Sequence, residues 1–289
     1  MEKYVIAIGG NALAEWESSL DNISEALFSL SKKAQILITH GNGPQAGELS
    51  IHEKKSLALI TKETQDTIGL RIKNSIEKVF HSKGESVHVD ILHTEVLVDR
   101  KDKAFSNPSK PVGKFYKSNV FLRHKGYQFK KFEEGFRRIV PSPIPKKLLD
   151  GNGITVRLSM GNIVIAGGGG GIPIVYEAGR KRFADCIVDK DYTTAVLADF
   201  INADKMVILT NVNGVYISLG KNKALKRIMD ITKAEEYMAS GEFGEGSMYP
   251  KVKSCVEFVK KRKGRMAAIG SISRAKDTID MKGCTVIKN

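Results

Sequence analysis

The sequence predicts an α/β fold in which helices cover both faces of a mostly parallel β-sheet. Short β-branched segments that run directly into glycine or polar turns alternate along the chain with segments of helical apolar periodicity. This alternation is typical of a doubly wound sheet, whose ligands collect where strand carboxyl ends meet helix N-termini. The sequence therefore also predicts where a binding site lies.

The predicted strands share one feature, a turn-forming segment immediately after the last apolar residue. They are Tyr4–Ile8 before Gly9-Gly10-Asn11, Ile36–Thr39 before His40-Gly41-Asn42-Gly43, Ile163–Ala166 before Gly167–Gly171, and Met206–Thr210 before Asn211-Val212-Asn213-Gly214. The predicted helices are Leu20–Lys33, Thr64–Phe80, Asp191–Phe200 and Met248–Lys263. We expect the helix at 191–200 to follow a further strand that ends at Val188.

Residues 99–147 interrupt the alternation of strands and helices. They combine prolines and many basic residues with closely spaced aromatic residues, among them Phe105, Phe115, Tyr116, Phe121, Tyr127 and Phe129. A disordered segment would hardly carry so many aromatic residues. We expect an ordered excursion from the sheet, a small lid with its own hairpins.

Composition excludes some classes of protein and leaves others open. The chain has 289 residues, of which 42% are hydrophobic and 27% charged, as in ordinary globular proteins. Its longest apolar run, 162–176, is broken by five glycines, and the N-terminus has no signal-peptide pattern, so we expect a cytoplasmic protein without a membrane partner. Cys186, Cys255 and Cys284 are far apart and are expected to be reduced thiols, and the histidines show no metal-binding spacing.

The formal net charge of +14 suggests anionic partners, which range from nucleic acid to nucleotides and phosphorylated metabolites. The basic residues are spread along the chain, and no aromatic nucleic-acid-binding motif accompanies them. We therefore expect no nucleic-acid partner. Much of this charge is interpreted as a solvated surface.

The glycine turns at 9–11, 41–43 and 167–171 point backbone N–H groups and helix N-termini toward one edge of the sheet, as a phosphate site requires. They match neither a Walker A loop nor a dinucleotide-binding fingerprint. Val188-Asp189-Lys190-Asp191 and Gly244–Lys251 add lysines and a carboxylate at helix N-termini. Phosphoryl transfer needs fixed positive charges around the phosphates and a carboxylate that holds the lysines. Each lysine taken alone is more often a solvated surface residue.

The motifs together resemble the carbamate kinases of the amino acid kinase family over nearly the whole chain. The resemblance rests on Ile8–Leu13, Thr39–Gln45, Asn107–Tyr116, Arg137–Pro143, Val164–Pro173, Val188–Asp191 and Gly246–Lys251. The segments at 107–116 and 137–143 distinguish carbamate kinases from other members of that family. The resemblance implies an αβα sandwich forming a single domain over 1–289. It also implies an N-terminal carbamate lobe of about 1–180 with a protruding subdomain at about 99–147, and a C-terminal nucleotide lobe of about 181–289.

The resemblance further implies a homodimer in arginine metabolism that transfers a phosphoryl group between ATP and carbamate with Mg²⁺. Mg²⁺ would be held mainly by phosphate oxygens, so no protein metal ligand is expected. The implied catalytic residues are Lys110, Lys190, Asp191 and Lys251. The implied substrate-binding residues are Gly9, Gly10, Asn11, Gly41, Asn42, Gly43, Gly168 and Gly169. The implied nucleotide-binding residues are Lys190, Asn211, Tyr216, Met248 and Lys251.

Some positions depart from the family pattern. Asn211 stands where an Asp is usual, and Tyr249 stands where a Gly is usual beside the phosphate-binding lysine. The segment 64–70 also differs, and the chain is shorter after Leu13. Three alternatives remain open: a kinase for an acylated amino acid or a nucleoside monophosphate, a non-catalytic nucleotide-binding protein on this scaffold, and a nucleic-acid binder.

Overall fold

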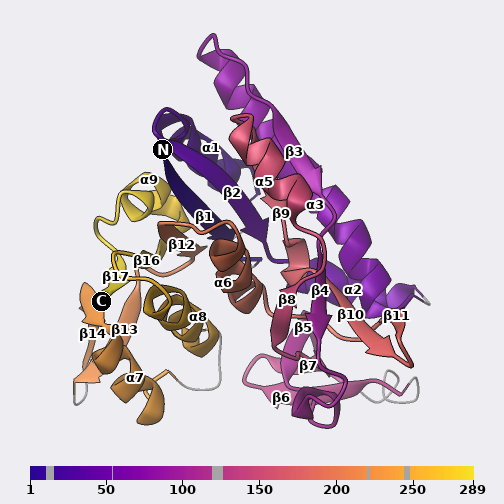
Figure 1. Ribbon diagram of the computed structural model, residues 1–289. Coiled ribbons are helices and arrows are strands. Elements are labelled where there is room, and N and C mark those ends of the chain that lie inside the picture. The colour runs from indigo at the N-terminus through magenta and orange to yellow at the C-terminus, as the bar shows by residue number, and fades with distance from the viewer. Residues whose placement is uncertain (11–15, 54, 119–125, 220–221, 244–247) are drawn as a thin grey trace.

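The computed structural model describes residues 1–289 apart from 11–15, 54, 119–125, 220–221 and 244–247. An eight-stranded sheet runs through the centre of the molecule (Figure 1). Its strands, in spatial order, are β15 (Ile228–Asp230), β17 (Thr285–Lys288), β16 (Met266–Ser271), β12 (Lys205–Thr210), β1 (Glu2–Ile8), β2 (Ala34–His40), β9 (Ile163–Ala166) and β3 (Val89–Leu92). Only β16 and β17 pair antiparallel in this sheet, so the prediction of a mostly parallel sheet is confirmed.

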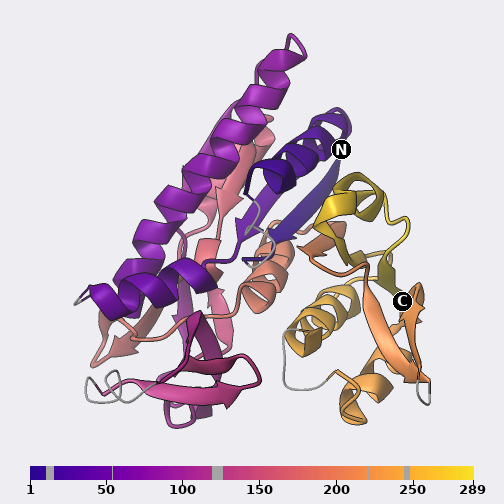
Figure 2. The ribbon, with the colours of Figure 1, turned by 180° about the vertical axis from the view of Figure 1, so that it is seen from behind.

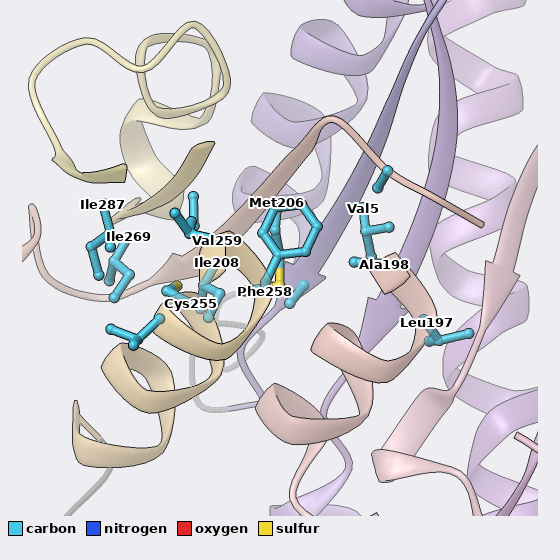
Figure 3. Packing of buried hydrophobic residues seen from close by; sticks show 14 of the residues in the cluster. Val5, Leu197, Ala198, Met206, Ile208, Cys255, Phe258, Val259, Ile269 and Ile287 are labelled. Carbon is cyan, nitrogen blue, oxygen red and sulfur yellow. The ribbon is translucent and has the colours of Figure 1, made fainter. Parts of the chain in front are cut away.

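Helices cover both faces of the sheet, which confirms the αβα sandwich. One face packs against α1 (Trp16–Ser31), α3 (Leu57–Ser82) and α9 (Ala275–Ile279) (Figure 2). The other packs against α5 (Asn152–Ser159), α6 (Lys190–Phe200), α7 (Ile231–Ala239) and α8 (Met248–Lys260). Figure 3 shows part of this second core, where Phe258 and Cys255 of α8 meet Met206 and Ile208 of β12.

The continuous apolar runs of the central strands follow from this two-sided burial. In β1, Tyr4, Ile6 and Ile8 face one core, whereas Val5 and Ala7 face the other. A strand covered on both faces needs apolar residues at every position, because successive side chains point in opposite directions. The β-branched segments of the sequence are therefore the strands of a buried parallel sheet.

Smaller sheets extend from this frame. A four-stranded sheet contains β11 (Arg180–Phe183), β10 (Ile172–Glu177), β4 (Glu95–Val98) and β8 (Pro145–Leu148). A hairpin joins β13 (Val215–Leu219) to β14 (Asn222–Lys226). The short helix α2 (Gly43–His52) and 3₁₀ turns at Lys103–Phe105, Gly168–Gly170 and Ile272–Arg274 complete the elements.

The described residues of 99–147 form the ordered excursion that the aromatic residues predicted, and Phe121 lies outside the described residues. Within it, β5 (Lys110–Tyr116), β7 (Gly135–Val140) and β6 (Gln128–Phe132) make a three-stranded antiparallel sheet, with β6 and β7 as a hairpin. We call residues 99–147 the lid. Figures 1 and 2 place its small sheet at the end of the molecule toward which β1 and β2 run.

The four strands and four helices expected from the sequence are all present, with ends that differ by a few residues. Helix α3 is the exception, because it begins at Leu57, where Ser56 caps it, and not at Thr64. The strand expected to end at Val188 is absent: β11 ends at Phe183, and residues 184–188 are irregular. The Ala184 N–H donates to the Pro173 carbonyl of β10, and the Ile187 N–H donates to the Pro141 carbonyl of a loop. Cys186, Ile187 and Val188 are buried, so the run is apolar because of burial and not because it forms a strand.

Among the described residues, no helix has both the length and the apolar character needed to cross a bilayer. Cys186, Cys255 and Cys284 are buried and form no disulfide, as expected.

Candidate active site

The first two glycine turns lie against each other because their strands are neighbours. Strands β1 and β2 pair in register up to Ile8 and His40, so both turns start at the same level of the sheet. The Gly41 N–H donates to the Ile8 carbonyl at 2.9 Å, and the Gly9 N–H donates to the Leu209 carbonyl at 3.0 Å. A Cβ at position 41 would lie 2.7 Å from the Gly10 nitrogen, so this approach requires glycine.

The third glycine turn packs beneath the second. A Cβ at Gly168 would lie 2.3 Å from His40 Nε2, and one at Gly169 would lie 2.3 Å from Asn42 Nδ2. Gly169 also has a φ of +64°, in the left-handed region that favours glycine. Gly168 and Gly169 are buried, so their clearest structural role is to leave room for the side chains of His40 and Asn42, which pack against them.

Polar residues of α3 hold these turns in place. Asn42 Nδ2 donates to Thr64 Oγ1 at 2.9 Å, and Gln65 Nε2 donates to the Gly168 carbonyl at 2.9 Å. Thr64 and Gln65 are almost completely buried on a helix face that is mostly apolar. The sequence analysis gave these two residues no role. Buried polar side chains in an apolar stripe were the available signal, because such groups need hydrogen-bond partners.

Asn42 precedes α2, whose N-terminus adds backbone N–H groups at the same edge of the sheet. Its own side chain does not cap the helix and is directed to Thr64 instead. The first N–H groups of a helix have no partner within the helix and carry its positive dipole end. A Cβ at Gly43 would meet nothing within 4 Å, which leaves open space beside this helix start.

The lysine cluster lies at the start of α6 and α8. Asp191 accepts hydrogen bonds from two lysines, with Oδ1 from Lys190 Nζ and with Oδ2 from Lys251 Nζ at 3.1 Å. All three side chains are buried. A Cβ at Gly41 would lie 3.6 Å from Lys190 Cδ, so the cluster adjoins the first two glycine turns.

The electrostatics of the cluster follow from this shared carboxylate. Burial lowers the pKa of Lys190, against the attraction of Asp191. Burial also acts to lower the pKa of Lys251, but Asp191 and Asp189 outweigh it and raise that pKa above its usual value. Lys251 is therefore held firmly as an ammonium ion at neutral pH.

The lid contributes a further lysine. Lys110, the first residue of β5, donates from Nζ to Asp189 Oδ2. Asp189 precedes α6 and caps it, because Oδ1 accepts from the Asp191 N–H at 2.9 Å. The three lysines and two aspartates carry one net positive charge. The contact between Lys110 and Asp189 was missed by the sequence analysis, since nothing in a sequence pairs residues 79 apart.

The other residues that the sequence analysis assigned to the nucleotide lie on separate elements. Asn211 follows β12 two residues after Leu209, whose carbonyl accepts from Gly9, so it lies at the edge that carries the turns. Tyr216 is 38% exposed on β13, and Met248 opens α8 and packs on the second core. Asn11 lies outside the described residues.

Backbone N–H groups, helix N-termini and fixed ammonium ions suit an anion that gains charge during reaction. The described residues include no group of three or more His, Cys, Asp or Glu side chains able to hold a metal. Among the described residues of the cluster, the carboxylates are Asp189 and Asp191, and both bind lysine.

Comparisons with known proteins agree with this arrangement. The profile of the amino acid kinase family matches residues 2–269. Carbamate kinase 3 of Staphylococcus aureus is 36% identical over all of both chains, and the carbamate kinase of Thermoplasma acidophilum is 35% identical over 99% of each. A carbamate kinase of Giardia lamblia, solved bound to AMP-PNP, matches with a TM-score of 0.86 and 28% identity over 99% of this chain and 98% of that one. The similarity covers the lid as well as the glycine turns.

Proposed function

The chain belongs to the amino acid kinase family, and because its similarity to carbamate kinases covers its whole length, we propose that it catalyses ATP + carbamate ⇌ ADP + carbamoyl phosphate. A carbamate oxygen bonds to the γ-phosphorus while the bond from that phosphorus to the bridging oxygen of ADP breaks. The attacking oxygen is already anionic, so the reaction requires no strong general base. Positioning and charge neutralisation then carry most of the catalysis.

The observation that carries this proposal is the Asp191 carboxylate, which holds Lys190 and Lys251 beside the glycine turns. Two buried ammonium ions fixed by one carboxylate can neutralise charge that develops on a migrating phosphoryl group without reorganising. Binding of a nucleotide alone would not require both lysines. We assign Lys110, Lys190 and Lys251 to the phosphates and Asp191 to orienting the last two.

We assign the acceptor side of the site to the glycine turns. The N–H groups of Gly10 and of the start of α2, together with that of Asn11, would bind the transferred group and the carbamate. Gly9 would act by placing this turn, because its own N–H donates to the Leu209 carbonyl. Gly168 and Gly169 would act by shaping the turn that carries Asn42. Asn211, Tyr216 and Met248 would line the nucleotide.

We also propose that the nucleotide binds with Mg²⁺. The Giardia lamblia relative was solved with the ATP analogue AMP-PNP, which supports a nucleoside triphosphate ligand here. Mg²⁺ prefers phosphate oxygens and water over protein cages, which fits a site with few free carboxylates. It would neutralise charge on the β- and γ-phosphates.

The division into a carbamate lobe of about 1–180 and a nucleotide lobe of about 181–289 is part of the proposal. The strands of both segments share one sheet, since β1 pairs with β12. We further propose a homodimer, which exposed apolar side chains on α3 and α5 support.

The test is formation of ATP from ADP, Mg²⁺ and carbamoyl phosphate by the purified protein. We expect clear activity, and a loss of at least about 100-fold in kcat for Lys190→Ala or Lys251→Ala, since each removes a preorganised charge from the migrating group. Lys260→Ala is the matched control, because Lys260 lies at the far end of α8 and pairs with Glu235 on the surface.

Wild-type activity in both Lys190→Ala and Lys251→Ala would contradict the site assignment. Absence of ATP formation by the wild-type protein would contradict the proposed reaction itself. Circular dichroism of each variant checks that the fold is retained.

A further inference from the structure

Asp189 lies at the junction between the lid and helix α6. Its two carboxylate oxygens have different partners on different elements. Oδ1 accepts from the Asp191 N–H at 2.9 Å and so caps α6, and Oδ2 accepts from the ammonium group of Lys110 in the lid. One side chain therefore joins β5 to the helix that begins with Lys190 and Asp191.

Capping alone does not explain an aspartate at this position. Asn and Ser cap helix N-termini about as well as Asp, and each would use a single oxygen, as the cap does here. The second oxygen of Asp189 accepts from Lys110, which a cap does not require. The pair is half-buried, with 21% of the Lys110 side chain and 18% of the Asp189 side chain exposed, so it is less screened than an exposed surface pair.

The charges around Asp189 explain why a carboxylate is needed. Burial acts to raise the pKa of the Asp189 carboxyl, but Lys110 and Lys190 outweigh it and hold that pKa well below its usual range. Asp189 is thus ionised at any pH at which a kinase would work. Without this charge, the Lys110 ammonium ion would approach those of Lys190 and Lys251 and lose the carboxylate that now faces it.

We propose that Asp189 is a positioning residue that docks the lid lysine Lys110 onto the N-terminus of α6, beside the Lys190–Asp191–Lys251 cluster. Asp189 acts through Lys110 and through the helix, not on the substrate. The proposal rests on the proposed function, because it assigns Lys110 to the transferred phosphoryl group. The pair holds Lys110 within the site before substrate arrives, so that little side-chain freedom remains to be lost in the reaction.

The test compares Asp189→Asn with Asp189→Ser. Both replacements keep a helix-capping oxygen and remove the charge that faces Lys110. The matched control is Asp230→Asn, the same chemical change at the N-cap of α7, where Asp230 Oδ1 accepts from the Lys233 N–H at 2.7 Å. We expect the melting temperature of each Asp189 variant to differ from that of the wild type by no more than that of Asp230→Asn does.

We expect kcat for ATP formation to fall at least about ten-fold in both Asp189 variants, with KM for ADP changed less than about three-fold. In a Lys110→Met background, Asp189→Asn should cause little further loss, because the two residues act as one unit. Unchanged kcat, increased kcat, or losses that simply multiply in the double variant would each overturn the proposal. A purely structural cap would lower the melting temperature without this coupling to Lys110.

A second measurement does not depend on activity. The rate at which an acylating reagent modifies the Lys110 amine, followed by mass spectrometry, should rise several-fold in Asp189→Asn and stay unchanged in Asp230→Asn. Faster labelling in a protein without kinase activity would leave the docking intact and reject the proposed function. Kinase activity with equal labelling rates in Asp189→Asn and the wild type would reject the docking and leave the proposed function intact.

Discussion

Asp191 shows how the site keeps two positive charges in a buried place. Lys190 and Lys251 are 8% and 7% exposed, and an unpaired ammonium ion at that depth would be strongly destabilising. The shared Asp191 carboxylate binds both ammonium ions and offsets part of their positive charge, and Lys110 and Asp189 add an ion pair beside them. The anionic phosphates of the proposed nucleotide would supply the remaining compensation. Affinity and catalysis then both depend on the positive charge of these lysines.

The single residue His40 makes the free energy of unfolding depend on pH. Burial lowers the pKa of its imidazole to about 4, and the hydrogen bond to the Gly41 carbonyl raises it only in part. In the unfolded chain a histidine has a pKa near 6.5, so the unfolded state binds the proton more readily as pH falls from 6.5 to 4. The stabilisation is complete above about pH 6.5 and is lost as the pH drops toward 4. The free energy of unfolding should fall by about 2 kcal/mol at pH 5 from this group alone.

Urea titrations of the wild type and His40→Asn at pH 7.5 and pH 5 measure this effect. The asparagine amide can still donate to the Gly41 carbonyl, but it does not titrate. The loss of stability on acidification should be about 2 kcal/mol smaller in His40→Asn than in the wild type. Equal losses in the two proteins would show that His40 is not the titrating group.

At the scale of elements, helix α2 joins the lid to the main body. The Ser50 carbonyl at its far end accepts from Tyr127 Oη at 3.0 Å and from Arg138 Nη1 at 3.1 Å, and Arg138 stacks over the Tyr127 ring. In the middle of α2, Gly47 lies directly on Gly113 of β5. The N-terminus of the same helix opens onto the candidate active site. A shift of the lid would therefore be transmitted to the turn that carries Asn42.

Gly47→Ala tests this contact. A Cβ at position 47 would lie 1.9 Å from the Gly113 nitrogen, so β5 must move away, and overpacking of this kind costs about 1–3 kcal/mol. Gly43→Ala on the same helix is the control for thermal stability, since its Cβ meets nothing within 4 Å. Both substitutions replace glycine by alanine, which has the higher helix propensity. The difference in melting temperature between the two variants therefore reports the clash of the new Cβ with Gly113. We expect a lower melting temperature and faster proteolysis within 99–147 only for Gly47→Ala. Equal behaviour of the two variants would mean that the lid does not depend on this contact.

At the scale of the whole molecule, two helices beside one edge of the central sheet carry exposed apolar side chains. Leu70 of α3 is 51% exposed, Val156 of α5 is 55% exposed, and Met160, the C-cap of α5, is 70% exposed. Both helices contact the edge strand β3, from opposite faces of the sheet. Apolar side chains grouped on one surface are typical of subunit interfaces. We place the proposed homodimer interface at this edge.

Sedimentation equilibrium of the wild type should give the mass of two chains. Val156→Lys combined with Met160→Lys should weaken association and shift the protein to the monomer, because charges at the core of an interface are unfavourable. Ile228→Lys is the control, since Ile228 is 62% exposed on β15 at the opposite edge of the sheet. A monomeric wild type would contradict the homodimer. A double variant that is still dimeric would show that the interface is not at this edge of the sheet.

The sequence by itself determined the central frame of this protein. Residues 4–8, 36–39, 163–166 and 206–210 are apolar at every position except the terminal Thr39 and Thr210, and turn-forming residues follow them. Both their strand conformation and their parallel, two-sided burial could therefore be predicted. The glycines at 9–10, 41 and 167–171 could be assigned to one edge because all parallel strands end there. The apolar run before Asp189 was misjudged, since burial in an irregular segment leaves the same pattern as burial in a strand.

Only the tertiary structure decided which charged and polar side chains meet. Sequence patterns report periodicity along the chain, and they carry no information on distances between residues that are far apart in it. Asp191 with Lys251, Asn42 with Thr64, and Asp189 with Lys110 are all contacts across loops or between elements. Each depends on how α6, α8, α3 and the lid pack around the sheet, which is set by the sum of many apolar contacts and not by any local motif.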